Sequence, residues 1–330
     1  MVGMAEGYCA FRAQLVPIQP GRGVDKPTPG ETLLARLQRA LVLLVLGTAL
    51  AWWLASGVMQ WGLAARIAVL MVLLLPHAWI LGLEFVLLWI WASPPSRPAV
   101  GSLLVAWWRE VWTGVRVFGW RQPFASDAVA DHLEPSRHAG RRGVILVHGF
   151  VCNRGLWSPW LRRLKQLDVP CIAVNLEPVF GSIDDYPPII DAAVTRMTEQ
   201  TGLAPVIVAH SMGGLATRAW LRSHGSVARF HHVVTIASPH HGTWLARFAL
   251  TANGRQMRLA SRWVSDLAAT ETSGLRGRFT CFHGSCDNIV FPVGTATLLG
   301  ADNRHLPGVA HVDMVSVPGV FDEVLRRVED

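Results

Sequence analysis

Two long apolar runs dominate the first third of the chain. Twenty-six residues between Arg39 and Arg66 include no Asp, Glu, Lys or Arg. The hydrocarbon core of a bilayer is about 30 Å thick and needs ~20 helical residues, so this run predicts one membrane-spanning helix. A second run from Ile67 to Ser96 predicts another, and the short join between them predicts an antiparallel transmembrane hairpin over residues 33–96. The alternative is a buried hairpin in the core of a soluble protein.

The second run contains a few polar residues that bear on its role. His77 and Glu84 are seven residues apart and therefore share one face of a helix. Because ionisable groups are costly in hydrocarbon, they could form a polar contact or a relay. We favour a neutral Glu84 packed against the partner helix, with a kink at Pro76. Basic residues flank the hairpin and only Arg66 lies in its turn, which predicts an inner (cytoplasmic) membrane protein with both termini cytoplasmic.

The segments on either side of the hairpin have different compositions. Residues 1–32 are rich in Pro and Gly and predict a disordered tail rather than a cleaved signal peptide. Residues 97–140 predict an amphipathic helix and a linker, and this helix could lie at the membrane interface or pack on the domain that follows. Its apolar stripe, opposed by Arg109, Thr113 and Arg116, consists of Leu104, Trp107, Trp108, Val111, Trp112, Val115 and Phe118.

From Arg141 onward, short β-branched runs alternate with helical stretches. Strands separated by helices predict a mostly parallel sheet with helices on both faces, which is an α/β fold, over residues 141–330. The expected strands are Gly143 to His148, Cys171 to Leu176, Pro205 to Ser211, His232 to Ala237 and Phe279 to His283. The expected helices are Trp157 to Leu167, Pro188 to Thr201, Met212 to Ser223 and Pro318 to Val328.

Composition narrows the possible classes of protein. Ten of the fifteen Trp lie between Trp52 and Trp120, so the apolar excess is concentrated near the proposed membrane segment. The net charge of +7 could suit nucleic acid, but no basic run is interleaved with stacking aromatics, so we expect no nucleic-acid partner. The five Cys show no metal spacing, and Cys281 and Cys286 would pair only under oxidising conditions.

The strongest local signal is a strand that runs into a sharp turn and then a helix around Ser211. A serine at such a turn adopts a strained backbone that lifts its hydroxyl above the sheet. The close contact between strand and helix permits only small residues two positions before and after it, and Ala209 and Gly213 meet that requirement. The pattern departs from Gly-x-Ser-x-Gly in its first residue, but Ala is still small.

Six motifs in one chain order resemble the α/β-hydrolase family, and more closely its bacterial lipases. The likeness covers about Gly143 to Val315 and implies an α/β-hydrolase fold preceded by the two-helix transmembrane hairpin. The motifs are Val147-His148-Gly149-Phe150, the turn around Ser211, Ala237 to Thr243, Arg255 to Ser261, Cys286-Asp287-Asn288-Ile289-Val290, and Gly308 to Val312.

The resemblance and the chain order serine, acid, histidine give candidate catalytic residues. A serine hydroxyl needs an imidazole to take its proton, and His311 is preferred over His283, His305 and the pair His240 and His241. The imidazole needs a carboxylate, and Asp287 is preferred over Asp302 and Asp313. The expected backbone donors of an oxyanion hole are Phe150 and Met212. His210 lies inside the turn and is expected to be structural.

The pattern as a whole predicts a membrane-anchored serine hydrolase acting on carboxylic esters of lipids or fatty acyl groups, without a cofactor or a metal. An acyltransferase or thioesterase using the same serine, or a catalytically silent membrane scaffold, remains an alternative. The expected partners are a lipid or acyl-ester substrate and the membrane, and the oligomeric state is open. Only residues 243–270 could form a cover over the site. His240 and His241 lack a further ligand at metal spacing.

Overall fold

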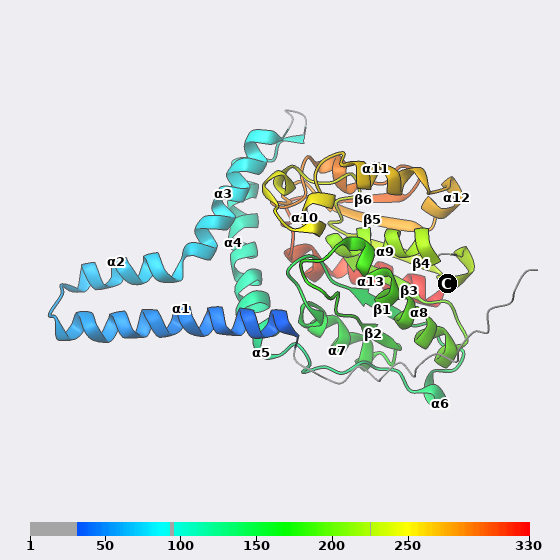
Figure 1. Cartoon of the computed structure of the whole chain (residues 1–330), viewed down its shortest axis with the longest axis horizontal. Coiled ribbons are helices and arrows are strands. Elements are labelled where there is room, and N and C mark those ends of the chain that lie inside the picture. Colours follow the sequence, from blue (N-terminus) through cyan, green and yellow to red (C-terminus); the bar gives the residue numbers. More distant parts are fainter. Residues whose placement is uncertain (1–31, 93–95, 225) are drawn as a thin grey trace, which may run out of the picture. The chain divides into compact units, whose positions relative to one another are not determined.

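A sheet of six parallel strands forms the centre of the C-terminal region in this computed structural model, which describes residues 32–92, 96–224 and 226–330 (Figure 1). The predicted tail lies outside these residues except for Thr32. The strand order is β2-β1-β3-β4-β5-β6, so the predicted parallel sheet is confirmed. The strands are β1 Val144–Val147, β2 Cys171–Ala173, β3 Val206–His210, β4 His232–Ile236, β5 Phe279–Gly284 and β6 Asp302–Leu306.

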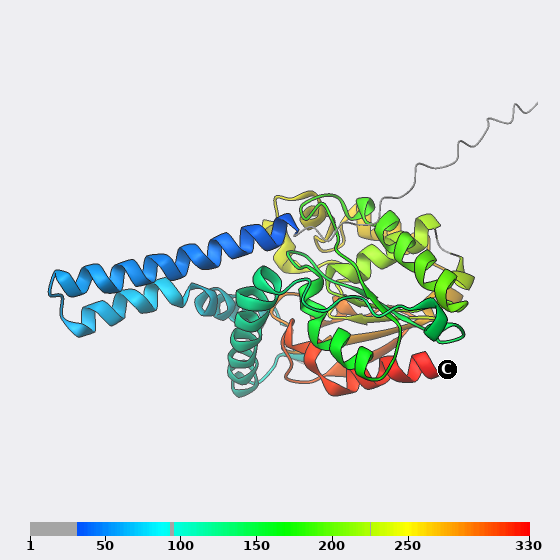
Figure 2. The same cartoon turned by 90° about the horizontal axis from the view of Figure 1, so that it is seen from below.

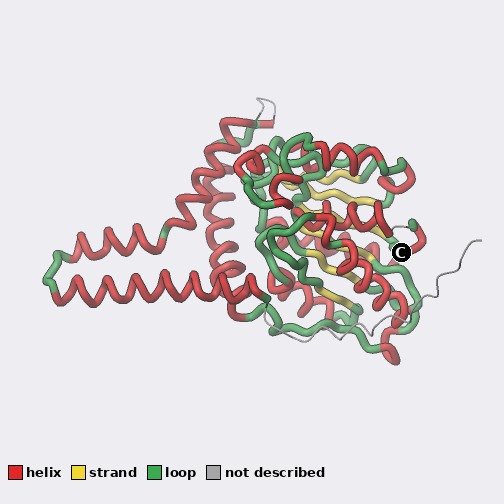
Figure 3. Tube along the Cα trace, in the orientation of Figure 1, coloured by secondary structure: helices red, strands yellow, loops and turns green. Residues whose placement is uncertain are grey.

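Helices cover both faces of this sheet (Figures 2 and 3). Ile145 and Val147 of β1 join an apolar cluster with α8 Pro187–Thr201 and α9 Met212–His224. Val144 and Leu146 point to the other side and join a cluster with α7 Ser158–Gln166 and α13 Pro318–Glu329. The alternation of strand residues between the two clusters explains why β1 is apolar at every position. All four predicted helices are present.

Two parts of the domain were not predicted. The edge strand β6 is polar and mostly exposed, because only one neighbour and little apolar surface cover it. Between β4 and β5 the chain forms short helices instead of a plain loop. They are η6 Trp244–Phe248, α10 Ala252–Gln256, α11 Arg262–Ala269 and α12 Ser273–Arg276.

The apolar N-terminal runs form three helices, not two. Helix α1 Leu33–Val58 lies antiparallel to α2 Leu63–Leu74, and α3 Pro76–Trp91 departs from α2 at a bend of 60° (Figure 1). The kink expected at Pro76 is therefore present, but the second run is not one continuous helix, contrary to the expectation. Among the described residues, α1 is the one helix that by itself has the length and hydropathy to cross a membrane.

Helix α4 Val100–Arg116, continued by the π-helical turn η2 Val117–Arg121, packs on the α/β domain. Its buried face is not the predicted apolar stripe. The buried residues are Leu103, Ala106, Glu110, Gly114 and Val117, whereas most of the stripe, including Trp108 and Trp112, is exposed. Helix α4 also packs closely against α3, and Gly114 allows this approach because a Cβ there would lie 2.3 Å from His77 Nε2 of α3.

Candidate active site

Ser211 lies at the turn between β3 and α9, as the sequence pattern predicted. Its backbone φ is +54°, a left-handed conformation that is costly for a residue with a side chain. Its amide donates to Ile236 O at 2.8 Å, which fixes the turn to the neighbouring strand. A Cβ on Gly213 would lie 2.6 Å from His148 O and 2.7 Å from Val147 O. The helix therefore packs so closely on β1 that only glycine fits there.

The loop after β1 lies directly against the candidate nucleophile. A Cβ on Gly149 would be 2.8 Å from Ser211 Cβ, so this position also requires glycine. His148 anchors this loop to the segment after β2, because its Nε2 accepts a hydrogen bond from the backbone amide of Leu176 at 3.0 Å. Burial lowers the pKa of His148 to about 4, which keeps this acceptor neutral. Phe150 and Met212, the expected oxyanion donors, are the residues that follow Gly149 and Ser211 in the chain.

Two loops from the far half of the sheet bring a histidine and a carboxylate to Ser211. His311 follows β6, and its Nε2 lies 3.0 Å from Ser211 Oγ. Asp287 follows β5, and its Oδ1 lies 2.9 Å from His311 Nδ1. The same Oδ1 accepts the amides of Ile289 at 3.0 Å and Val290 at 2.8 Å, which fixes the carboxylate. The structure thus brings together all three side chains that the sequence singled out.

The surroundings of His311 favour protonation of its imidazole although the ring is buried. Burial by itself lowers the pKa of His311, but the charge of Asp287, the hydrogen bond to Asp287 and the charges of Glu110 and Glu84 raise it above the ordinary value. His210 has a different role, because its Nε2 lies 3.2 Å from His311 O and burial holds its pKa well below the usual range. A neutral His210 therefore braces the backbone of His311.

The alternative candidates for the catalytic acid and histidine have other partners. Asp302 pairs with Arg304 on the edge strand at 2.7 Å. Asp313 pairs with Arg109 of α4 at 2.9 Å. His283 and His305 stack on each other in β5 and β6, with ring centroids 5.3 Å apart. His240 is buried with its Nε2 3.0 Å from Thr235 Oγ1, and the amide of His241 donates to Thr295 O.

Residues 243–270, the expected cover, are tied to the domain at several points. Thr243 Oγ1 donates to Ile289 O at 2.5 Å, beside the loop of Asp287. The side-chain Nδ2 of the buried Asn253 donates to Val179 O at 2.8 Å, and its backbone amide donates to Gly181 O. Just beyond this segment, Glu271 forms a buried bidentate ion pair with Arg218 of α9 at 2.6 and 3.1 Å. This segment therefore forms a wall of the domain.

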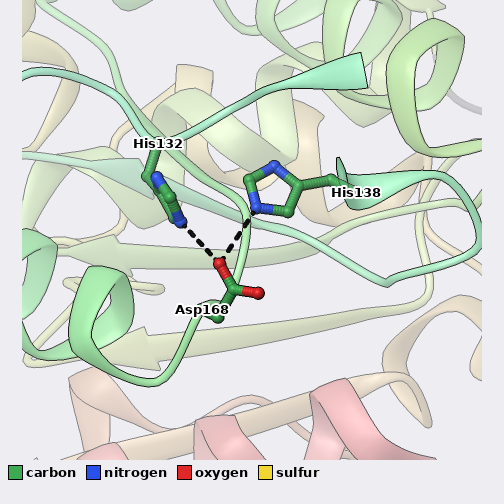
Figure 4. Close-up of side chains that lie close together, drawn as sticks. All are labelled: His132, His138 and Asp168. Carbon is green, nitrogen blue, oxygen red and sulfur yellow. Dashed lines mark hydrogen bonds and ion pairs between the residues drawn. The ribbon is translucent and has the colours of Figure 1, made fainter. Parts of the chain in front are cut away.

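The described cysteines and the remaining clustered histidines lie outside the candidate triad. Cys152, Cys171, Cys281 and Cys286 are free and buried. One group in the described part of the chain has metal-like spacing: His132 and His138 around Asp168, beside the edge strand β2 (Figure 4). His138 Nδ1 accepts the amide of Glu134 at 2.9 Å, so the neutral ring carries its proton on Nε2 and donates toward Asp168. Two arginines of the same linker also pair with Asp168. The group is thus a carboxylate surrounded by donors.

Sequence reasoning did not place three polar side chains next to the site. Glu110 of α4 and Glu84 of α3 both contact the loops that carry His311 and Asp287, and Asn288 lies between those loops. Glu84 thus makes a polar contact, one of the two alternatives named above, with the α/β domain, and the favoured expectation that it packs against a partner membrane helix is wrong. Glu110 could have been suspected from its place between Ala106 and Gly114 on one helical face.

Comparisons with known proteins agree with the architecture. A model of the Alpha/beta hydrolase family matches residues 144–321, more than half of the chain. The crystal structure of Bacillus licheniformis lipase BlEst2 in mature form superposes with a TM-score of 0.51 and 15% identity, over 60% of this chain and 95% of that chain. Aspergillus fumigatus lipase B gives a TM-score of 0.46 and 21% identity, over 55% of this chain and 49% of that chain. No curated protein sequence matches this chain.

Proposed function

The chain belongs to the alpha/beta hydrolase family, and from this premise we propose that it is a membrane-bound serine esterase or lipase that hydrolyses esters of lipids or fatty acyl groups. The observation that carries the proposal is the continuous chain of contacts from Ser211 Oγ to His311 Nε2 at 3.0 Å and from His311 Nδ1 to Asp287 Oδ1 at 2.9 Å. These distances are within the range needed for proton transfer between a nucleophile and its base.

The contacts translate into two chemical steps. As Ser211 Oγ attacks the ester carbonyl carbon, its proton moves to His311 Nε2, and the amides of Phe150 and Met212 stabilise the negative oxygen that develops. The attack gives a tetrahedral intermediate. Its collapse breaks the bond to the alcohol, which leaves with the proton from His311. Water then attacks the acyl-serine and gives a proton to His311. When this second intermediate collapses, the bond to Ser211 Oγ breaks, the proton passes from His311 to Oγ, and the acid is released. Asp287 stabilises the imidazolium in both steps and stays ionised.

Apolar surface beside the site supports an acyl substrate. Phe180, half exposed, contacts the ring of Phe150 with centroids 6.0 Å apart, next to the proposed oxyanion donor. Leu250 is 83% exposed and lies just before Asn253, whose amide bonds to Gly181. Large apolar side chains left exposed around a polar site suit a long acyl chain better than a charged substrate.

Membrane attachment through α1 and α2 is the second part of the proposal. Both helices expose large apolar side chains along their length, for example Leu44 and Leu50 in α1 and Met71 in α2. The one cation near their shared end, Arg66, is satisfied internally: it donates to Trp53 O at 2.9 Å and to Ser56 Oγ at 3.2 Å. Internal pairing of this kind lowers the cost of a charge in lipid. The basic residues at the other end support a cytoplasmic domain.

Hydrolysis of a graded ester panel tests the substrate class. We expect the purified full-length protein to cleave p-nitrophenyl esters, with kcat/KM rising from the acetyl to the medium and long acyl chains, and the variant Ser211→Ala to be inactive on all of them. A matching panel of acyl thioesters separates the thioesterase alternative. Activity limited to short polar esters would remove lipid from the proposal, and activity that survives in Ser211→Ala would remove the serine mechanism.

Carbonate extraction of cell membranes tests the attachment. We expect the wild-type protein to stay in the membrane pellet, and the double variant Leu44→Arg, Leu50→Arg to be released. The matched control is Leu299→Arg, because Leu299 is also an exposed leucine but lies in the α/β domain. Release of the wild-type protein by carbonate would contradict membrane insertion.

A further inference from the structure

Two carboxylates of the N-terminal helices reach the loops that carry the proposed base and acid. Glu110 of α4 is 2% exposed, and its two oxygens accept the amides of Val312 at 2.8 Å and Asp313 at 3.0 Å, immediately after His311. Glu84 Oε2 of α3 accepts Asn288 Nδ2 at 2.6 Å. These contacts connect segments about 200 residues apart in the chain.

Asn288 transmits the second contact to the histidine. Its Nδ2 donates to Glu84, while its Oδ1 accepts the amide of His311 at 3.3 Å. Since Asn288 directly follows Asp287, the acid loop and the histidine loop are joined to each other and to α3 by one side chain. Asn288 and His210 therefore contact the backbone of His311 itself, and Glu110 holds the two amides that follow it.

An apolar cluster surrounds these polar contacts. Phe85 and Leu88 of α3 pack with Leu103 and Ala106 of α4 and with residues of the α/β domain. The domain side of the cluster includes Cys286, Phe291 and Ala310. Cys286 immediately precedes Asp287, and Ala310 immediately precedes His311. The same helices thus cover the two catalytic loops and exclude water from the hydrogen bonds that hold them.

We propose that α3 and α4 are part of the catalytic unit, with Glu110 and, through Asn288, Glu84 acting as positioning residues that hold His311 in line with Ser211. This inference rests on the proposed serine mechanism. It assigns these helices a role beyond attachment: removing or displacing them would misplace the histidine even when the sheet stays folded.

The environment of Glu110 fits a positioning role better than a purely structural one. The carboxyl accepts two backbone amides, no cation of the described residues lies within ion-pair distance of it, and burial raises its pKa to about 7. A buried carboxylate without a cation is costly to stability, so a neutral residue would serve folding better. Its negative charge near His311 instead adds to that of Asp287 in favouring the imidazolium that forms during catalysis.

Variants of the full-length protein test the proposal. Glu110→Gln keeps the shape but opposes an NH2 group to one backbone amide, so we expect kcat for a p-nitrophenyl ester to fall about 10- to 100-fold, because a displacement of ~1 Å costs roughly that much, with KM nearly unchanged. We also expect the acid limb of the pH profile to move to lower pH, since His311 then faces Asp287, Glu84 and the neutral His210 without the negative charge that Glu110 adds when it is ionised. The exposed Glu199→Gln on α8 is the control and should match the wild type.

A second pair of variants covers the case in which Glu110→Gln does not fold. Glu84→Leu removes the acceptor of Asn288 and should lower kcat, whereas Glu84→Gln keeps an acceptor oxygen and should restore it. A folded Glu110→Gln protein with wild-type kcat and pH profile overturns the inference, as does equal activity of Glu84→Leu and Glu84→Gln. If the wild-type protein itself shows no serine-dependent hydrolysis, the proposed function fails instead, so the two failures are distinguishable.

Discussion

Replacing Asp287 by Asn removes a charge beside His311 while leaving an oxygen in the same place. Asp287 Oδ1 accepts three hydrogen bonds, from His311 Nδ1 and from the amides of Ile289 and Val290. Two fixed backbone donors select the oxygen of an asparagine amide over its NH2 group. We therefore expect Asp287→Asn to keep His311 in the right orientation and tautomer, and to lose only the negative charge.

The magnitude follows from that geometry. A hydrogen bond to a charged group contributes about 1.5–3 kcal/mol and a neutral one about 0.5–1.5 kcal/mol, so the difference is at most about 2.5 kcal/mol, or about 70-fold in rate. Losing the tautomer as well costs about 10⁴-fold in serine hydrolases. Asp287→Ala, which removes the acceptor altogether, should approach that larger loss. In Asp287→Asn the new NH2 group would take the place of Oδ2, which is buried without a hydrogen-bond partner, so the free energy of unfolding should also fall.

Steady-state kinetics on one p-nitrophenyl ester decide between these outcomes. We expect Asp287→Asn to retain at least 100 times the kcat/KM of Asp287→Ala, a margin set by the about 10⁴-fold and about 70-fold losses above, with Ser211→Ala as the background. Circular dichroism and thermal unfolding check that each variant is folded. Equal losses for Asp287→Asn and Asp287→Ala would refute the reasoning, because they would mean that the two backbone donors do not fix the oxygen.

Three further predictions follow from other contacts. Gly213→Ala should destabilise the fold by about 1–3 kcal/mol or more and abolish activity, because its Cβ would lie 2.6 and 2.7 Å from backbone oxygens; thermal unfolding and ester hydrolysis measure both effects. Since the pKa of His311 is raised above 6.5 and the neutral imidazole is the base, kcat/KM should fall with decreasing pH along a limb centred above pH 6.5 in a pH-rate profile. Arg218→Met should cost up to about 3–5 kcal/mol in urea unfolding, because the buried Glu271 loses its bidentate partner and keeps the contact with Arg276 at 3.3 Å, and adding Glu271→Leu should recover most of that loss.

The sheet and the serine turn could be predicted because their signals are local. The turn at Ser211 is encoded within about ten residues, by a β-branched run, small residues at positions 209 and 213, and a helical stretch. Strands β1 and β2 are apolar at every position, and β3 is apolar up to His210. By contrast, β6 has a polar sequence, and only the chain's path back to β5 makes it a strand.

The N-terminal helices could not be placed from the sequence, for a different reason. Hydropathy reports how apolar a segment is, not what covers it, and helix α4 buries a face with Glu110 and Gly114 while exposing Trp108 and Trp112. Shape complementarity to α3 and to the loop that carries His311 determines which face of α4 is buried. The roles of Glu84 and Glu110 depend on contacts that only the folded chain creates.

Fluorophosphonate labelling followed by peptide mapping tests the central claim most directly. An activity-based phosphonate reacts only with a serine whose hydroxyl is activated by a neighbouring base, so the wild-type protein should carry one adduct, located on Ser211, and Ser211→Ala should carry none. His311→Ala should fold and label far more slowly. An unlabelled wild-type protein, or an adduct that persists in Ser211→Ala, would contradict the assignment of this serine as the nucleophile.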